Sequence, residues 1–257
     1  IYSVIAHHEK YFKFIKTFKN KIPIFLIDRI DQPRIYIDHK NISKKFNKDF
    51  FDYIFKADLP ISYDDQDVFP LSPLPIRKIK DFEKKEKIYD FSFIGKFGVR
   101  ERKDRDELIE FIKENFSNSK IIDTTKKKNR ISHEEMSNIL CQTKINISPS
   151  GVVWDSYRHM ELVNNGSPIL IPKNKECKVI EPEFKDMENC ITYDTQLLEG
   201  EWRLTNKKEL LNKLTKCLNN DELLDKIYFN YKNFVEKYHL RINRSKYVCD
   251  IIKQKTK

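Results

Sequence analysis

The chain has 257 residues, of which 39% are hydrophobic and 12% aromatic, enough for one large globular domain or two modest ones and too apolar for a disordered chain. The formal net charge of +10 favours anionic partners such as nucleotide phosphates, acidic glycans, anionic lipids or nucleic acid, although a Lys-rich genomic bias explains part of it equally well. The five cysteines have no CxxC or paired spacing, as in reduced thiols, and no apolar run reaches the roughly 18 residues that cross a bilayer.

The N-terminal third predicts a short α/β unit followed by a linker. We expect strands at 1–6, 22–28 and 60–63, a helix at 8–20 and a short helical piece at 49–55. The segment 67–87 contains several prolines and ends in a charged run, which is typical of a linker. Because the chain starts with Ile1 inside an apolar run, we expect the natural protein to begin earlier.

The pattern restarts after the linker. We expect strands at 88–94, 120–123, 144–148, 168–171 and 189–193, and helices at 105–116, 132–142, 156–165 and from 207 onward. Ser132 and Glu135 form a capping box, and Gly166 closes the helix before it. Strands that alternate with helices of about ten residues predict parallel, doubly wound sheets. The fold class is therefore α/β, with two Rossmann-like domains that face a cleft.

The first loop with binding chemistry follows the strand at 88–94. Gly95 and Gly98 are two of only five glycines in the chain, so each is expected to meet a backbone need. Lys96 and Arg100 stand just before a helix start, where a pyrophosphate would need positive charge. An ordinary strand-to-helix turn with solvated basic side chains remains the alternative.

A second loop, from Ser148 to Ser156, lies between the next strand and helix. Ser150, Gly151 and the free N–H groups of the helix start would make an anion cradle. One turn later, Arg158 and Glu161 share a helix face, where the arginine could hold a phosphate and the carboxylate a ribose diol. The alternative is a surface ion pair worth about 0.3–0.5 kcal/mol.

The block from Asn146 to Pro172 resembles the donor site of GT-B glycosyltransferases. Its run S-P-S-G followed by R-x-x-E and G-S-P-I is most similar to the spore-maturation-type and exostosin-like groups. The strand and loop around Gly95, and the helical tail after Leu214, resemble the same groups, so the resemblance covers residues 88 to 253.

The resemblance implies a glycosyltransferase that moves a sugar from a nucleotide-sugar donor to a glycan, lipid-linked or protein acceptor. The donor, UDP- or GDP-linked, would be a substrate, with no further cofactor. Glu161 would hold the ribose, and the Ser150–Gly151 loop with Arg158 the diphosphate. His159 would touch the donor sugar or phosphate, or else lie on the helix surface. Such enzymes need no metal, because cationic side chains and helix dipoles offset the leaving-group charge.

The N-terminal part departs from that pattern. The first 80 residues, taken as a partial acceptor-side domain with its linker, are too few for a full Rossmann domain. Residues 81–235 would form the donor-binding domain, and 236–257 a C-terminal helix that could pack back on the first. An inverting enzyme would need a base on the acceptor side; the candidates are His7, His8, Asp28 and Asp31.

Two other classes of function fit parts of the sequence. Mixed aromatic and basic residues at 11–16 suggest nucleic-acid binding, but the aromatics there follow a helical period and the basic residues are scattered, so we expect no nucleic-acid partner. A catalytically inert donor-fold subunit is the other alternative. For the enzyme, we expect a cytoplasmic location with peripheral contact to the anionic inner face of a membrane.

Overall fold

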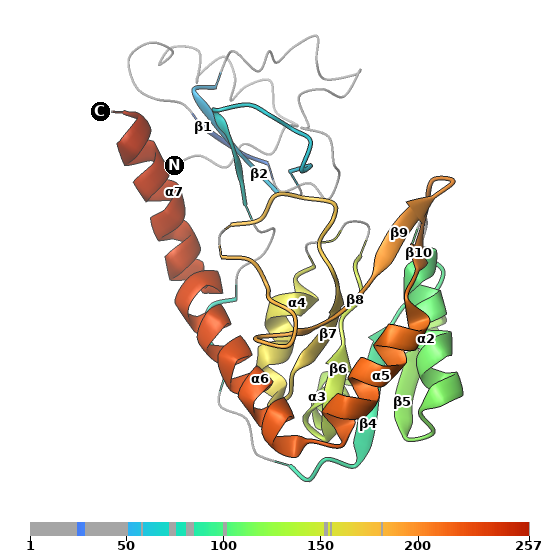
Figure 1. The fold of residues 1–257 in the computed structure, drawn as a ribbon. Coiled ribbons are helices and arrows are strands. Elements are labelled where there is room, and N and C mark those ends of the chain that lie inside the picture. Colours follow the sequence, from blue (N-terminus) through green and yellow to red (C-terminus); the bar gives the residue numbers. More distant parts are fainter. Residues whose placement is uncertain are drawn as a thin grey trace.

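The computed structural model describes residues 25–28, 51–57, 59–71, 76–80, 85–99, 102–151, 154, 156–180 and 182–256. The strand expected at 1–6 and the helix expected at 8–20 lie outside these residues. Two separate parallel sheets and an antiparallel hairpin are described, which confirms the α/β class (Figure 1).

The larger sheet has the strand order β5-β4-β6-β7-β8, and every neighbouring pair is parallel. Its strands are β4 (Tyr89–Gly95), β5 (Ser119–Asp123), β6 (Thr143–Ile147), β7 (Ile169–Pro172) and β8 (Ile191–Tyr193). All five were predicted within two residues. β7 is a continuous apolar run that is buried along its whole length, as expected for a strand covered on both faces, whereas β5, at the edge of the sheet, is half-buried throughout.

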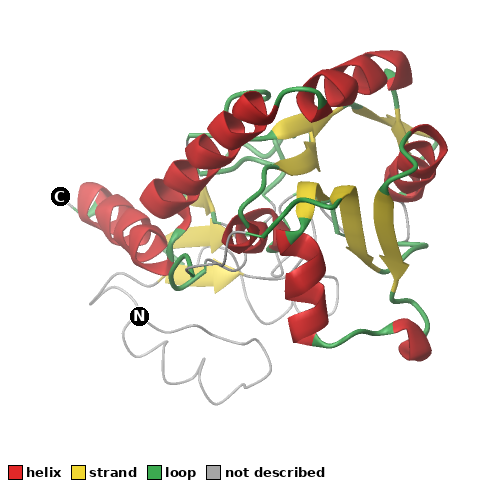
Figure 2. Ribbon diagram, turned by 90° about the horizontal axis from the view of Figure 1, so that it is seen from below, coloured by secondary structure: helices red, strands yellow, loops and turns green. Residues whose placement is uncertain are grey.

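Helices cover both faces of this sheet, as Figure 2 shows. They are α2 (Lys103–Asn115), α3 (His133–Cys141), α4 (Arg158–Glu161), α5 (Lys207–Leu218) and α6 (Asp221–Phe234), with short 3₁₀ turns η3 (Lys127–Asn129) and η4 (Leu162–Asn165). One core cluster joins the sheet to α2 and α5; the other joins it to α3, α4 and η4. α6 contributes buried side chains to both clusters.

Local signals set these helix ends. The Ser132 side chain accepts a hydrogen bond from the Glu135 N–H at 3.0 Å, so the N-cap predicted for α3 is confirmed. Gly166 follows η4 in the left-handed region at φ 70°, where glycine is favoured. The helix expected at 156–165 is instead the short α4 followed by η4.

The smaller sheet contains β1 (Phe25–Asp28), β2 (Tyr53–Lys56) and β3 (Val68–Pro70), all parallel. The helix expected at 49–55 is therefore wrong. The segment is an aromatic and β-branched run in which Ile54, Phe55 and Lys56 are fully buried, and such runs suit a central strand. The linker was expected to begin at residue 67, but β3 occupies residues 68–70, so the linker begins after β3. The strand expected at 60–63 is reduced to one bridge from Pro60 to Cys177.

Two C-terminal features complete the architecture. The hairpin of β9 (Thr195–Leu198) and β10 (Glu201–Leu204) was not predicted. After α6, a π-helical turn, η5 (Val235–His239), leads into α7 (Arg241–Lys255), which runs to the smaller sheet (Figure 1). There the Tyr247 ring meets Phe55 with centroids 6.4 Å apart. None of the described helices is both long and apolar enough to cross a bilayer.

Candidate functional site

The strand order of the larger sheet marks where a ligand is expected. Chain connections leave β4 toward β5 on one side, whereas β6, β7 and β8 follow on the other. In open α/β sheets, ligands bind at the carboxyl ends of the strands where the strand order reverses. Here that point lies between β4 and β6, and the loops that start there are the two loops singled out in the sequence.

Two arginines brace these loops crosswise. Arg105, on the helix that follows β4, donates from Nη1 to the carbonyl oxygen of Ser150 at 3.3 Å. Arg158, on the helix that follows β6, donates to the carbonyl oxygen of Ile94 at the end of β4. Each loop is therefore held by a side chain from the other, and both guanidinium groups meet at the switch point.

Neither guanidinium forms an ion pair with a carboxylate of the described residues, in contrast to Arg102 and Arg203. Burial, and then repulsion from Arg158, lowers the pKa of Arg105 below its ordinary value. Burial also lowers the pKa of Arg158, with partial compensation from Glu161. Two half-buried like charges without an ion-pair partner favour an anion between the loops.

Unsatisfied donors lie at the same place. The Ser150 hydroxyl and the Nε of Arg105 are buried and have no hydrogen-bond partner among the described residues. Such groups are rare in native structures, because an unpaired buried polar group costs about 1–3 kcal/mol. Phosphate oxygens could accept from both, which sharpens the case for an anion site.

Gly95 is closely surrounded by two side chains. A Cβ at Gly95 would lie 2.6 Å from Cζ of Phe93 and 2.9 Å from Nη2 of Arg105, so a larger residue would force the Phe93 ring or the Arg105 guanidinium to move. Gly151 differs, because a Cβ there would meet nothing within 4 Å. The space beside Gly151 is open and leaves room for a ligand.

The positive charge of the site resides in side chains. The N–H of Gly98 donates to the Asp106 carboxylate at 3.0 Å, and the N–H of Arg158 donates to the Ser156 hydroxyl at 3.3 Å. These backbone donors are therefore occupied within the loops, and α4 has only four residues. Lys96 is exposed at the rim of the first loop.

Arg158 and Glu161 line one cavity of about 280 Å³, together with residues of α3 and the linker. Glu161 is half-buried, so its carboxylate remains accessible from this cavity. The cavity thus has a cation at one end and an acceptor of two hydrogen bonds one helical turn away. That pair fits a phosphorylated sugar bearing a free diol.

His159 lies beneath the second loop. It is fully buried, its Nδ1 contacts the Ser148 hydroxyl at 2.8 Å, and its Nε2 contacts the carbonyl oxygen of Trp154 at 2.9 Å. Because a carbonyl only accepts, Nε2 carries the proton and Nδ1 accepts from Ser148. Burial lowers the pKa of His159 to about 3. The neutral ring therefore links Ser148 to Trp154 by two hydrogen bonds across the second loop.

The remaining sequence candidates fall outside what the structure describes. His7, His8, Asp31 and Arg100 lie among residues that are not described, and Asp28 ends β1 without a described side chain. Arg105 was not among the site residues predicted from the sequence. Its signal was present, since it ends the basic run that opens α2, but only the fold shows that it reaches Ser150.

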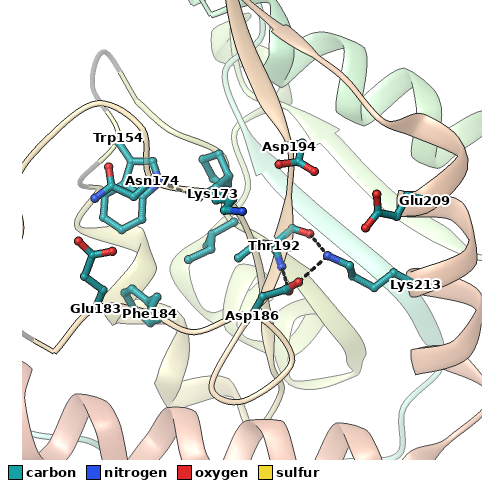
Figure 3. A pocket seen from close by; sticks show the side chains of 12 residues that line it. Trp154, Lys173, Asn174, Glu183, Phe184, Asp186, Thr192, Asp194, Glu209 and Lys213 are labelled. Atoms are coloured by element: carbon teal, nitrogen blue, oxygen red, sulfur yellow. Dashed lines mark hydrogen bonds and ion pairs between the residues drawn. The ribbon is translucent and has the colours of Figure 1, made fainter. Parts of the chain in front are cut away.

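A second cavity, of about 210 Å³, lies at the carboxyl ends of β7 and β8 (Figure 3). Asp186, Asp194 and Glu209 line it with two lysines. Lys213 is already paired with Asp186 at 2.6 Å and donates to the Thr192 carbonyl oxygen at 2.9 Å. This excess of carboxylates would repel a diphosphate, so the arginine pair is the better anion site. In the described part of the chain, no three His, Cys, Asp or Glu side chains gather to hold a metal.

No family model matches the chain, and no curated protein matches it. Solved structures do. A chain of the GtfA/B complex superimposes with a TM-score of 0.60 at 9% identity, over 94% of this chain and 54% of that one. The pneumococcal O-GlcNAc transferase GtfA, in complex with UDP and GlcNAc, gives 0.50 at 9% identity, over 94% and 54%.

A TarM variant from S. aureus, in complex with fondaparinux, alpha-GlcNAc-glycerol and UDP, gives a TM-score of 0.51 at 14% identity, over 94% of this chain and 46% of that one. This chain thus spans about half the length of the structures it matches. The structures are GT-B glycosyltransferases, so the GT-B-like fold is confirmed. The finer resemblance to the spore-maturation-type and exostosin-like groups stays a prediction.

Proposed function

We propose that the chain binds a nucleotide-sugar donor, UDP- or GDP-linked, and transfers its sugar to a glycan, lipid-linked or protein acceptor. The observation that carries the proposal is the arginine pair, Arg105 and Arg158, at the switch point of the sheet without a carboxylate ion-pair partner in the described residues. Two of the similar structures contain UDP, which supports a nucleotide as the kind of ligand that the chain binds.

In this proposal the diphosphate lies between the two loops. Arg105 and Arg158 contact its oxygens, Lys96 approaches from the rim, and the Ser150 hydroxyl donates from below. Glu161 accepts hydrogen bonds from the ribose diol within the cavity it shares with Arg158. Gly95 and Gly151 give the backbone close approach and open space. His159 positions the second loop without touching the donor.

The same groups would assist departure of the nucleotide. Negative charge develops on the diphosphate as the bond to the sugar breaks, and fixed guanidinium groups in a half-buried site stabilise that charge. We propose that no metal ion is needed for this step. A base on the acceptor side would take the proton of the attacking hydroxyl, and His7, His8, Asp28 and Asp31 remain the candidates for it.

We also propose a cytoplasmic enzyme of polysaccharide biosynthesis that contacts anionic membrane lipids peripherally. All five cysteines are free thiols, which suits a reducing compartment. The net charge of +10 suits anionic head groups.

A thermal-shift panel of UDP- and GDP-sugars tests the proposal. A ligand at one hundred times its Kd adds about 2.7 kcal/mol of stability, which raises the Tm of a chain of this size by roughly 5–10 °C. We expect such a rise for at least one donor with the wild type and a much smaller one with Glu161→Ala. Glu188→Ala, at an exposed site in the turn that precedes β8, is the control. Failure of every nucleotide to stabilise the wild type would refute the function, and unchanged binding by Glu161→Ala would refute the ribose assignment.

A further inference from the structure

The loop after β7, residues 173–178, touches both halves of the molecule. The Asn174 side chain holds it in shape: its Oδ1 accepts from the N–H groups of Glu176 and Cys177 at 3.2 and 3.3 Å, and its Nδ2 donates to the Cys177 carbonyl oxygen at 2.8 Å. Three hydrogen bonds to one side chain therefore hold the loop in one local conformation.

One side of this loop is joined to the N-terminal part of the chain. The N–H of Ile61 donates to the carbonyl oxygen of Glu176 at 3.1 Å, and the N–H of Lys178 donates to that of Leu59 at 2.6 Å. Between them, Pro60 pairs with Cys177 in an antiparallel bridge. Leu59 and Cys177 are almost fully buried, so this short junction is packed as well as hydrogen-bonded.

The other side of the loop is joined to the first anion loop. Oε1 of Glu176 accepts from Nη1 of Arg102 at 2.6 Å, and Nη2 of Arg102 donates to Asp104 at 3.0 Å. Arg102 and Asp104 are fully buried. Burial raises the pKa of Glu176, and attraction to Arg102 opposes that rise. The Glu176 carboxylate is therefore held in an ion pair with Arg102.

Arg102 in turn fixes the backbone that carries Arg105. Its N–H donates to the Val99 carbonyl oxygen at 3.0 Å, which closes the first loop, and its own carbonyl oxygen accepts from the N–H of Arg105 at 3.2 Å. One residue, Glu176, thus bonds Ile61 through its backbone carbonyl oxygen and Arg102, at the start of α2, through its side chain.

We infer that Glu176 is a positioning residue that couples the N-terminal part of the chain to the arginine pair. Removing one partner of a buried ion pair leaves an uncompensated charge, so displacement of residues 59–61 that carries Glu176 away from Arg102 also disturbs the start of α2. The inference rests on the proposed function only in taking the loop at Arg105 to be the donor site; the coupling itself is a property of the protein without ligand.

Hydrogen exchange of the ligand-free protein tests the coupling from both ends. Ile61→Pro removes the N–H that reaches Glu176, while the matched control Ile61→Ala shortens the same half-exposed side chain and keeps the N–H. Glu176→Gln removes the charge at the Arg102 end, with Glu188→Gln as its control. We expect Ile61→Pro to accelerate exchange in residues 96–106 by about five-fold or more, in the usual range of coupling between sites, and Glu176→Gln to do the same in residues 59–63.

The coupling would be overturned if Ile61→Pro accelerated exchange only in residues 59–63 and 174–178. In that case the exchange rate of residues 96–106 would be the same in Ile61→Pro as in Ile61→Ala. If Ile61→Pro does not fold, Glu176→Gln decides alone: faster exchange in 96–106 without any change in 59–63 would also overturn it. Titrations of the same variants with UDP and with GDP separate the two proposals, because a wild type that binds neither nucleotide but shows the exchange coupling refutes the function and leaves the inference standing.

Discussion

At the scale of single residues, the arginine pair makes a prediction that needs no knowledge of the donor sugar. Pyrophosphate should raise the Tm of the wild type by occupying the space between Arg105 and Arg158. Because hydrogen bonds to charged groups are worth about 1.5–3 kcal/mol, Arg105→Gln should weaken pyrophosphate binding roughly ten- to hundred-fold. Lys253→Gln, which removes the same charge from the exposed end of α7, is the control in a calorimetric titration, and equal losses in the two variants would show that only net charge attracts the anion.

His159 predicts a pH dependence of stability. The unfolded histidine has a pKa of about 6.5, and burial lowers the folded value to about 3. The unfolded state therefore binds more protons between these values, and the stability present above pH 6.5 is lost as the pH falls. At pH 5 the loss is about 2 kcal/mol.

Urea unfolding of the wild type and His159→Gln at pH 7 and pH 5 measures this loss. The variant lacks the titrating ring, so the stability advantage of the wild type should shrink by about 2 kcal/mol at the lower pH. An advantage that is the same at both pH values would mean that His159 is not held neutral by burial.

At the scale of elements, Gly166 and Gly151 are expected to differ in their effect on stability, because only Gly166 has a backbone conformation that favours glycine. Gly166 has φ 70° after η4, so Gly166→Ala should reduce the free energy of unfolding by about 1–2 kcal/mol. Gly151 has open space around its Cα and no left-handed φ, so Gly151→Ala should leave stability nearly unchanged. Denaturant curves of both variants check the contrast, and equal losses would contradict it.

The sequence predicted the larger sheet well, because its strands alternate with helices whose ends are marked by caps and glycines. The prediction failed where a strand was short and its partners were distant in the chain. The segment at 53–56 was predicted as helical although its aromatic and β-branched residues suit a strand; four residues are too few to show a period, and pairing with β1 and β3 makes the segment a strand. The hairpin of β9 and β10 was missed although Glu199 and Gly200 form a two-residue turn with positive φ, a typical hairpin signal.

The residues of the candidate site fall into the same two groups, those predicted from local spacing and those that only the fold brings together. Their spacing of three residues predicted that Arg158 and Glu161 share a helix face, and both line one cavity. Arg105 and Glu176 were not predicted, because their contacts join residues 45 and 74 positions apart in the chain. Such contacts depend on the order of strands in the sheet, which a single sequence does not state.

At the scale of the whole molecule, the two sheets are joined at separate places. The junction of 59–61 with 176–178 is one, and the passage of α7 onto β2 is another, where the Tyr53 hydroxyl donates to the Lys255 carbonyl oxygen at 3.0 Å. A third links the linker to the start of α7, where the N–H of Arg241 donates to the Ile76 carbonyl oxygen at 2.8 Å. These junctions connect the N-terminal part of the chain to the domain that carries the proposed donor site.

The central claim is that the arginine pair recognises the diphosphate of a nucleotide. It is tested most directly by comparing, in EDTA, the affinities of UDP and uridine, and of GDP and guanosine, for the wild type and for Arg105→Gln/Arg158→Gln. The account predicts that one nucleotide binds the wild type at least about a hundred-fold more tightly than its nucleoside, and that the double variant loses most of this difference. Equal affinities in the wild type, or a preference that survives in the double variant, would contradict it.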